Sequence, residues 1–578
     1  MVKSHSRRRN RQYKFDRIHM LVVFFLLLIL LIAWRLFRLQ VLEGDFFRSV
    51  ASDQRVLQKE LIAERGNIYT RFGRGTDELQ PLAINEPRAQ VFAVPNEIDN
   101  PTIVTEALAE VIEIDKEVIL GRLEKVNDLY EPIAHKVSLE QSDRLNSLGL
   151  SGIYTSPESM RVYSLGSIFG GITGFVGNVE SKEVGQYGVE QAEQEVLAGK
   201  AGFIVSERDP RGYLISLADR TFIPAKHGAD IILTIDPNIQ STACRLLDEA
   251  VKRYDAVSGS IVIMNPKTGE IGALCVNPSF DPNNYSKVED INIYRNQVIS
   301  GAYESGSIFK VITMAAALDA KAVKPNTSYV DEGEVEFKDF TIRNAEGKVY
   351  GEQNMSQVLE KSINTGVVFA ALETGRKTFR KYVKDFGFGK KTGIEMPTES
   401  AGDISSLDKK GEIFLATASY GQGITVTPIQ MVQALGVIAN NGIMVKPHII
   451  SEIIYKDDKK KVVGVQELGQ IIKPQTATTL SAMLVGVVED GYGDRARVPG
   501  YYVAGKTGTA QVAGKTGGYS NNTIHSFVGF APISDPRFVM LVKLDQPQKG
   551  RFAASTVAPV FREMSNFLLQ YYQVIPER

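Results

Sequence analysis

A basic segment followed by a long apolar run opens the chain and restricts what the rest of it can fold into. Residues 1–18 carry seven Lys and Arg residues against a single acidic residue. Met20 to Trp34 are then 15 consecutive apolar residues. A membrane-spanning helix needs about 20 such residues, and long Arg side chains at the ends of a shorter run can reach the interface. We therefore predict a basic tail at residues 1–18 and a transmembrane anchor at residues 19–40.

Two other structures for this segment are disfavoured. A cleaved signal peptide needs small residues at its cleavage site, whereas the residues that follow here, Trp34 to Arg38, are bulky. A buried helix of a soluble domain does not fit the cations that precede it. Because Lys and Arg are retained on the cytoplasmic side of membranes, we expect the N-terminus in the cytoplasm and everything after about residue 40 outside.

Size and composition set broad limits on the remainder. The 578 residues are enough for three to four domains of about 150 residues each. The 43% of hydrophobic and 23% of charged residues are ordinary for packed globular domains, and a net charge of −1 argues against a nucleic-acid-binding protein. Cys244 and Cys275 are the only cysteines, both in apolar or helical settings. We expect buried free thiols here, because a chain this long with two cysteines is not stapled by disulfides.

The chain after the anchor is predicted to be α+β and to divide into two domains. The first, residues 41–222, combines short strands with helices at about 102–112 and 116–126, and we expect it to be a non-enzymatic pedestal. Within it, Arg161 and Glu190 predict a structural ion pair. The charged, turn-rich sequence near 203–230 marks the boundary with the second domain, residues 223–578.

The second domain is predicted to contain an antiparallel sheet flanked by helices. A helix runs from Pro237 to about Tyr254, and two β-rich segments joined by Asn265–Gly269 predict a hairpin. A further helix closes the chain from Val557 to about Tyr571. We expect the N- and C-terminal helices to lie against the sheet, with an all-helical subdomain inserted between the strands.

The chemistry is predicted in the stretch from Tyr303 to Lys310, inside that subdomain. Ser307 and Lys310 are three residues apart and share one helix face, and Gly306 permits a sharp bend into the helix. The apolar residues that follow indicate a buried helix. Ser307 would then lie at a helix N-terminus, where developing negative charge is stabilised, and a buried Lys310 would have a lowered pKa and could act as a base.

Ser-x-x-Lys alone is weak evidence, because Ser406 and Lys409 match it in a polar stretch. Two further motifs strengthen the first site. Ser362 and Asn364 lie two residues apart between apolar helical segments, so an extended loop would point both toward one cleft. A similar Ser520-Asn521-Asn522 sits in what we expect to be a polar turn.

Lys-Thr-Gly occurs four times, and only the copy at Lys506-Thr507-Gly508 continues an apolar strand that has a β partner downstream. A strand edge with a cation and two hydroxyls can bind a carboxylate and run beside a peptide. The other copies, at 267, 391 and 515, fall in turns or loops. His525 lies beside a β run, and we expect it to be structural or at a cleft rim rather than a base.

Ser307-x-x-Lys310, Ser362-x-Asn364 and Lys506-Thr507-Gly508, in this order, resemble the penicillin-recognising serine transpeptidases and β-lactamases. The amino-terminal half narrows the resemblance to class B penicillin-binding proteins, membrane-anchored peptidoglycan transpeptidases with a pedestal. Further matching motifs are Arg65-Gly66-x-Ile68, Arg161-x-Tyr163, Leu233–Asp236, Gly269-Glu270-Ile271, Pro278–Asn283 and Thr427–Gln430. Departures from the family pattern are Ser305 for Pro, Ile308 for Thr, Thr70 for Asp, Phe72 for Asn and Ser164 for Pro.

The resemblance implies a role for each site residue. Ser307 attacks the peptide carbonyl to form an acyl-enzyme, Lys310 takes its proton, Ser362 relays a proton to the leaving amine, and Asn364 holds the substrate amide. Lys506 supplies positive potential, and Thr507, Gly508 and Thr509 bind substrate, the two hydroxyls taking the terminal carboxylate. Backbone N–H groups of Ser307 and Thr509 form the oxyanion hole. No metal or organic cofactor is needed.

The implied function is cross-linking of stem peptides that end in D-Ala-D-Ala, at the outer face of a bacterial cell membrane, with β-lactams as inhibitors. A serine β-lactamase would need neither anchor nor pedestal, a β-lactam sensor would need a cytoplasmic signalling domain, and an inactive scaffold would show a broken motif. The compact pedestal and the short C-terminus favour the division type. This type implies a membrane glycosyltransferase and other division proteins as partners.

Overall fold

The structure, a computed structural model, describes residues 17–44, 56–73, 75–125, 128–180, 182–207, 221–338, 340–514 and 518–578. Most of the predicted basic tail and the charged segment at 208–220 therefore lie outside the described residues. The described chain forms two compact units, one containing residues up to 63 together with 200–226, the other containing residues 64–199 and 227–578.

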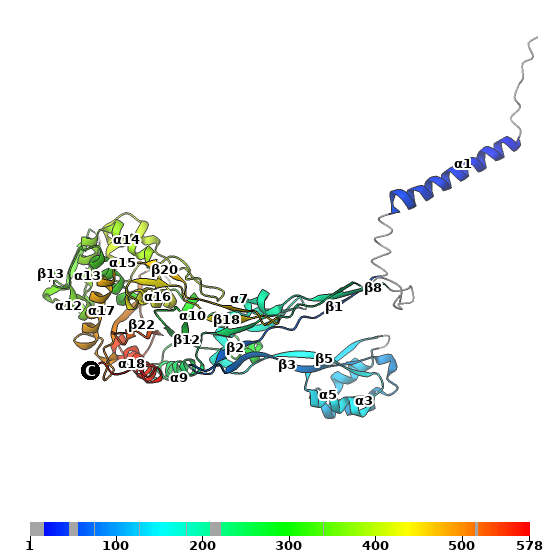
Figure 1. Cartoon of the computed structure of the whole chain (residues 1–578), viewed down its shortest axis with the longest axis horizontal. Helices are drawn as coiled ribbons and strands as arrows, with labels where there is room; N and C mark the ends of the chain where they lie inside the picture. Colours follow the sequence, from blue (N-terminus) through cyan, green and yellow to red (C-terminus); the bar gives the residue numbers. More distant parts are fainter. Residues whose placement is uncertain are drawn as a thin grey trace, which may run out of the picture. The chain divides into compact units, whose positions relative to one another are not determined.

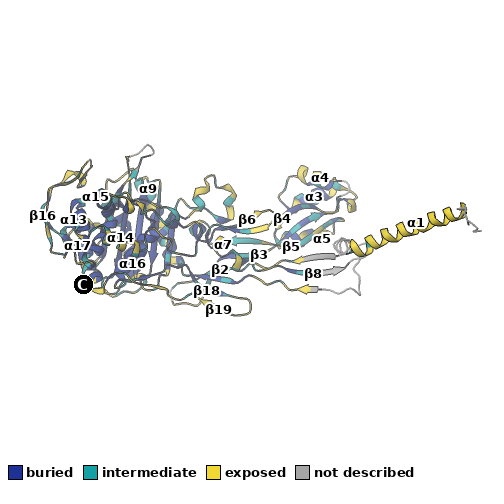
Figure 2. Ribbon diagram, turned by 90° about the horizontal axis from the view of Figure 1, so that it is seen from above, coloured by how far each residue is buried: buried dark blue, intermediate teal, exposed yellow. Residues whose placement is uncertain are grey.

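The first unit contains the apolar helix and a small sheet. α1 (Arg17–Phe37) continues as a π-helix (Arg38–Leu42), and the whole stretch of 26 residues is long and apolar enough to cross a membrane. Its side chains are exposed along almost its entire length (Figure 2). The sheet is antiparallel, in the order β1-β8-β9, and consists of β1 (Val56–Leu61), β8 (Gly202–Glu207) and β9 (Thr221–Ile223). This helix supports the predicted anchor, and its orientation stays a prediction.

The second unit begins with a seven-stranded sheet in the order β19-β18-β10-β2-β3-β4, with β5 also paired to β3. Figure 1 labels β2, β3, β5 and β18 of this sheet. Only the β10–β2 pair is parallel. The strands are β2 (Ile68–Arg71), β3 (Leu79–Ala93), β4 (Glu131–Val137), β5 (Ile153–Tyr163), β10 (Asp230–Leu233), β18 (Ile450–Ile454) and β19 (Lys460–Val462). Three of these strands come from the sequence after residue 222, so this sheet joins segments on both sides of the predicted domain boundary.

Helices complete this part of the molecule. α3 (Pro101–Val111), α4 (Lys116–Leu123) and α5 (Leu139–Leu148) enclose a small apolar core with β3, β4 and β5, and the first two confirm the predicted helices. The Gly-rich segment that follows forms short elements: η3 (Gly166–Ile168), α6 (Gly170–Thr173), β6 (Phe175–Val179), β7 (Lys182–Gln186), α7 (Gly188–Ala192) and α8 (Gln194–Ala198).

A buried carboxylate ties the start of β2 to this segment. Glu190 is fully buried, and Arg161 Nε donates to one of its oxygens at 2.8 Å. Arg65 Nε donates to the other oxygen at 2.7 Å. A buried charge is tolerated only where it is paired and hydrogen-bonded, and here two guanidinium groups satisfy both oxygens. The predicted Arg161–Glu190 ion pair is confirmed, with Arg65 as an additional partner.

A five-stranded antiparallel sheet is the centre of the larger part of the second unit, in the order β12-β11-β23-β22-β21. Its strands are β11 (Ser258–Met264), β12 (Ile271–Asn277), β21 (Ala504–Ala513), β22 (Tyr519–Ala531) and β23 (Phe538–Asp545). One face packs on α9 (Pro237–Tyr254) and α18 (Ala553–Tyr571), as predicted for the N- and C-terminal helices. The other face packs on α11 (Lys310–Asp319) and α16 (Pro428–Ala439), both almost wholly buried. Burial is concentrated in these layers (Figure 2).

The inserted subdomain is mainly helical but not entirely so. Its helices are α10 (Gln297–Ser300), α12 (Met355–Glu360), α13 (Asn364–Thr374), α14 (Arg376–Asp385), α15 (Glu412–Ser419) and α17 (Pro474–Glu489). Two short hairpin-like sheets accompany them: β13 (Ser328–Asp331) with β16 (Gly351–Asn354), and β14 (Glu334–Phe337) with β15 (Phe340–Arg343). β17 (Ile443–Val445) pairs with β20 (Glu467–Gln470). The α+β class is confirmed, while the expectation of an all-helical insert missed these short strands.

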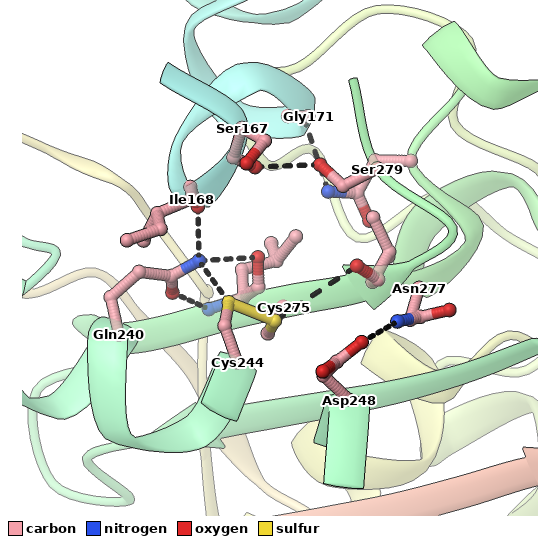
Figure 3. The surroundings of a disulfide bond; sticks show 12 residues. Ser167, Ile168, Gly171, Gln240, Cys244, Asp248, Cys275, Asn277 and Ser279 are labelled. Carbon is pink, nitrogen blue, oxygen red and sulfur yellow. Dashed lines mark hydrogen bonds between the residues drawn. A yellow bond between two sulfur atoms is a disulfide. The ribbon is translucent and has the colours of Figure 1, made fainter. Parts of the chain in front are cut away.

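The two cysteines form a disulfide, so the expectation of free thiols is wrong. Cys244 on α9 and Cys275 on β12 have Cα atoms 5.4 Å apart (Figure 3). α9 packs across the edge of the sheet, and Gln240 holds it there by accepting the Leu274 N–H at 2.8 Å and donating to the Ile168 carbonyl at 3.0 Å. This packing brings two cysteines 31 residues apart within bonding distance, which spacing in the sequence does not reveal.

Loss of this disulfide is expected to destabilise the fold. By the loop-closure argument, a crosslink across 31 residues contributes about 3–4 kcal/mol, mainly by restricting the unfolded chain. Chemical unfolding monitored by circular dichroism, with and without a reductant, measures this difference. The Cys244→Ala/Cys275→Ala double variant is the control: its unfolding midpoint should be low and unaffected by reductant. Equal midpoints for the wild type in both conditions would contradict the expectation.

Candidate active site

The segment that carries Ser307 makes a sharp turn into a buried helix. Gly306 has a φ of +56°, a left-handed conformation that glycine adopts without steric cost. The turn is a 3-10 helix, η6 (Gly306–Phe309), which α11 continues from Lys310. The Gly306 N–H donates to the Gly421 carbonyl at 3.1 Å and anchors the turn. Ser307 therefore lies in the first helical turn, as expected, with its side chain half-buried.

Ser305 and Ile308 depart from the family pattern on either side of Ser307, and the helical turn still begins at Gly306, just before Ser307. Ser305 is fully buried, and its hydroxyl makes no hydrogen bond to the described residues. Ile308 packs on the strand that carries Gly508. A Cβ added to Gly508 would lie 2.9 Å from Ile308 Cγ2 and 2.7 Å from Ser526 Oγ, so only glycine lets the strand approach the turn this closely.

Lys310 is fully buried one turn after Ser307, and its amine nitrogen reaches three oxygens. Nζ donates to the Ser362 carbonyl at 2.6 Å, to Asn364 Oδ1 at 2.7 Å and to Ser362 Oγ at 3.2 Å. Burial, and then the nearby charge of Lys506, hold the pKa of Lys310 well below its ordinary value. A buried lysine whose pKa is lowered loses its proton more easily, and the neutral amine can accept a proton from a neighbouring hydroxyl.

Ser362 and Asn364 both contact Lys310, but not from the extended loop that the sequence predicts. Ser362 has a φ of +53°, and Asn364 is already the first residue of α13. Only three residues connect α12 to α13, so the chain has to turn tightly there. The prediction of their proximity agrees with the geometry, and the prediction of an extended loop is wrong.

A buried hydrogen-bond network, which the sequence did not reveal, positions this turn. Asn344 Oδ1 accepts the backbone N–H of Asn364 at 3.0 Å and that of Thr365 at 3.2 Å. Asn344 Nδ2 donates to both carboxylate oxygens of Asp331 at 2.9 Å, and Thr365 Oγ1 donates to Asp331 at 2.5 Å. Asn344 and Asp331 lie in the unanticipated short-strand region, outside any motif, so only the three-dimensional fold connects them to the site.

Lys506 enters the site from the strand opposite. It lies on β21, an edge strand of the five-stranded sheet, and is fully buried. Its Nζ donates to Ser362 Oγ at 3.0 Å and to the Thr507 carbonyl at 3.2 Å, so the Ser362 hydroxyl bridges two lysines. Burial lowers the pKa of Lys506 to about 7. Along an edge strand, alternate backbone N–H and C=O groups have no strand partner and can pair with a peptide.

These elements surround one cleft with a volume of about 670 Å³. The side chains of Thr507, Thr509 and Gln511 alternate along β21 and line it, as does Ser307. Other lining residues are Arg343, Glu346, Lys348, Tyr350, Ser362, Asn364, Tyr420, Tyr492, Arg551 and Phe552. A smaller cavity of about 330 Å³ lies near Thr70 and Asp236 and contains none of the predicted site residues.

The competing motifs lie elsewhere. Ser406 is in a short 3-10 helix, η8 (Ser405–Asp408), and Lys409 is exposed. Lys267–Gly269 forms the β11–β12 turn, Lys391–Gly393 is a loop, and the copy at 515–517 lies outside the described residues. Ser520–Asn522 is part of β22, so the expectation of a polar turn is wrong.

His525 is buried between two threonines and does not line the cleft. Its ring nitrogens lie 2.8 Å from Thr556 Oγ1 and 3.0 Å from Thr523 Oγ1. Burial lowers the pKa of His525 to about 4, so the ring is neutral at physiological pH. This environment supports a structural role, in which the histidine joins β22 to α18.

Replacing Lys506 by methionine is expected to stabilise the fold. The folded-state pKa of about 7 lies below the ordinary 10.5, so the unfolded chain binds more protons between those values and stability rises with pH in that window. Below about pH 7 Lys506 is charged in the folded protein, and its burial lowers the free energy of unfolding by the full amount. At such pH, the methionine variant should have a free energy of unfolding about 1–3 kcal/mol higher than the wild type. Chemical unfolding at pH 6.5 and 10 tests this: the gain should shrink at the higher pH. A gain that is constant or grows with pH would contradict it.

Comparisons with known proteins show the family to which the chain belongs. The penicillin-binding protein transpeptidase domain matches residues 259–566, and the penicillin-binding protein dimerisation domain matches residues 60–233. The chain therefore belongs to the class B penicillin-binding proteins, in which a dimerisation domain precedes a transpeptidase domain.

Individual relatives cover nearly the whole chain. Stage V sporulation protein D of Bacillus subtilis is 34% identical over 552 residues, which cover 94% of this chain and 84% of that protein. Peptidoglycan D,D-transpeptidase FtsI of Escherichia coli K12 is 30% identical over 562 residues, covering 94% and 89%. The crystal structure of penicillin-binding protein 2X from Streptococcus thermophilus has the same fold, with a TM-score of 0.76 at 23% identity over 89% of this chain and 80% of that one.

Proposed function

We propose that this protein is a membrane-anchored peptidoglycan D,D-transpeptidase that cross-links stem peptides ending in D-Ala-D-Ala through an acyl-enzyme on Ser307. One observation carries the proposal: the Ser362 hydroxyl lies 3.2 Å from Lys310 Nζ and 3.0 Å from Lys506 Nζ, in the cleft that Ser307 lines. Ser307 lies one helical turn before Lys310, whose pKa is lowered, and a serine near such a lysine can be activated as a nucleophile. The name of the Escherichia coli relative states the same activity for that protein.

The proposal assigns each site residue a role that its position supports. Lys310 accepts the proton of Ser307 as the hydroxyl attacks the carbonyl of the penultimate D-Ala, and the proton passes through Ser362 to the leaving D-Ala amine. Asn364 fixes Lys310 and presents its side chain to the substrate amide. The peptide lies along the β21 edge, with its terminal carboxylate at Thr507 and Thr509 and Gly508 keeping the strand close. Backbone N–H groups of Ser307 and Thr509 stabilise the oxyanion, at about 3 kcal/mol per donor. An amine from a second stem peptide then attacks the acyl-enzyme.

The cellular setting is part of the proposal. α1 anchors the chain in the bacterial membrane with its N-terminus inside, residues 41–222 act as the pedestal, and residues 223–578 act outside the membrane as the catalytic domain. We place the protein among the septal enzymes, working with a membrane glycosyltransferase and other division proteins. Depletion of the protein tests this role, since it should block septum formation and leave elongation intact.

The test of the reaction separates a transpeptidase from a β-lactamase. Uncross-linked glycan strands with pentapeptide stems are incubated with the full chain in detergent, and the products are digested and analysed by mass spectrometry. A transpeptidase yields cross-linked dimers with release of free D-Ala, whereas a hydrolase yields tetrapeptide monomers and free D-Ala without dimers. Rapid hydrolysis of penicillin with no cross-linked product would favour the β-lactamase alternative.

A further inference from the structure

An ion pair joins the two walls of the catalytic cleft beside β21. Arg551, in the loop before α18, pairs through Nη2 with Glu346 Oε1 at 3.0 Å. Glu346 belongs to the inserted subdomain and also pairs with Lys348 at 3.0 Å. All three side chains line the same cleft as Ser307. The pair therefore spans the space that a peptide on the β21 edge would enter.

The contact holds Arg551 only loosely. The Arg551 side chain is 76% exposed, and an ion pair so open to water contributes little, because both partners are well solvated when apart. The guanidinium also lies 5.1 Å from the centroid of the Phe552 ring, which lines the same cleft. Glu346 keeps a second cation, Lys348, if Arg551 departs. Another carboxylate in the cleft can therefore replace Glu346 as the partner of Arg551 with little loss of free energy.

The backbone fixes the Arg551 loop next to the substrate strand. The Ala553 N–H donates to Thr509 Oγ1 at 3.1 Å, which sets the loop beside the residue expected to contact the donor peptide. The other cations that line the cleft, Arg343, Lys348 and Lys361, have their partners within the inserted subdomain and not across the cleft. Arg343 Nε donates to Glu334 at 2.8 Å, and Lys361 Nζ donates to Gln353 at 2.7 Å. Lys506 is fully buried beneath the surface, whereas Arg551 is exposed and carries a permanent charge.

We propose that Arg551 exchanges Glu346 for a carboxylate of the donor stem peptide and is thereby a specificity-determining residue of the cleft. The choice of ligand rests on the proposed function. The carboxylate belongs either to the C-terminal D-Ala or to the side chain of the residue before D-Ala-D-Ala. A planar guanidinium can bind either with two parallel hydrogen bonds. Glu346 is the competing carboxylate of the empty cleft, and it directs Arg551 toward the cleft until substrate arrives.

Equilibrium binding to the full chain in detergent tests the exchange without depending on catalysis. In a Ser307→Ala background, isothermal titration calorimetry measures the affinity of four peptides ending in D-Ala-D-Ala: with or without a side-chain carboxylate at the preceding residue, each as a C-terminal acid or amide. Arg551→Gln should weaken binding about tenfold for peptides with the recognised carboxylate and leave the others unchanged. The pair of peptides that responds identifies the carboxylate. Glu346→Gln should strengthen binding of the same peptides about twofold to fivefold.

Lys549→Gln is the matched control, because Lys549 lies in the same loop, is exposed and does not line the cleft. It should leave all four affinities unchanged. An Arg551→Gln variant that binds all four peptides like its parent, or loses affinity equally for all four, overturns the proposal, and so does a parent that binds none of them. Penicillin labelling of the chain with Ser307 intact tests the proposed function separately, since it depends on acyl transfer and not on these affinities.

Discussion

Replacing Ser307 by alanine is expected to abolish covalent labelling by a fluorescent penicillin and to abolish cross-linking. Ser307 lines the cleft and lies in the first turn of the buried helix, one turn before Lys310. Without its hydroxyl group, an acyl-enzyme cannot form. Removal of a nucleophile typically costs a factor of about 1000 or more in rate, and here no covalent adduct should remain. Gel fluorescence after a saturating incubation measures the labelling.

The Ser406→Ala variant is the matched control, because Ser406 opens the other Ser-x-x-Lys sequence from a short 3-10 helix. Its labelling should equal that of the wild type. Circular dichroism should show the same fold for both variants, so that a lost signal reports chemistry. Persistent labelling of the Ser307→Ala protein would refute the assignment of the nucleophile.

Substitution of Lys310 is expected to slow acylation about 100-fold to 10,000-fold, the range for loss of a general base. Two variants separate the role of Lys310 as a proton acceptor from its role as a positive charge. Lys310→Met removes both, and Lys310→Arg keeps the charge but cannot accept a proton, because arginine stays protonated. Both should be slow if the deprotonated amine is what matters. The fold should persist, because a methionine side chain can fill the buried space of the lysine methylene groups. Stopped-flow measurement of penicillin acylation gives the rates, and an Arg variant as fast as wild type would contradict the base role.

The pH dependence sharpens this expectation. The pKa of Lys310 is lowered by burial and by the charge of Lys506, so the acylation rate should rise with pH as the coupled pair loses a proton. Lys506→Met removes one of these causes, so the pKa of Lys310 rises and the rise in rate should move to higher pH. Lys409→Met, beside the unused serine, should leave the profile unchanged. A profile that moves to lower pH in Lys506→Met would show that Lys506 does not lower the pKa of Lys310.

Local sequence signals predicted much of the scaffold. Pro237 marks the start of α9, and two β-rich segments around a Gly-containing turn mark β11 and β12. The continuous apolar run after Lys310 predicted a helix that is buried all round. The order of three short motifs then selected one Ser-x-x-Lys and one Lys-Thr-Gly, and the fold brings Lys310, Ser362, Asn364 and Lys506 within hydrogen-bonding distance of one another or of a shared atom.

The parts that escaped prediction depend on contacts between distant segments. The Cys244–Cys275 bond requires α9 to lie on β12, which the sequence spacing does not show. The Asn344–Asp331 network orders the turn at Ser362 from strands of only four residues, too short for a periodic pattern. Arg551 and Glu346 are about 200 residues apart and meet only because two walls of one cleft face each other. Such features follow from tertiary packing, which local propensity does not encode.

The attachment site of penicillin tests the central claim most directly. Wild-type protein is treated with benzylpenicillin and digested with trypsin, and the peptides are sequenced by mass spectrometry. The peptide Asn296–Lys310, bounded by Arg295 and Lys310, should gain the mass of one penicillin molecule, and fragmentation should locate it on Ser307. An adduct on another residue, such as Ser406, or no adduct under conditions in which the protein is folded, would contradict the account.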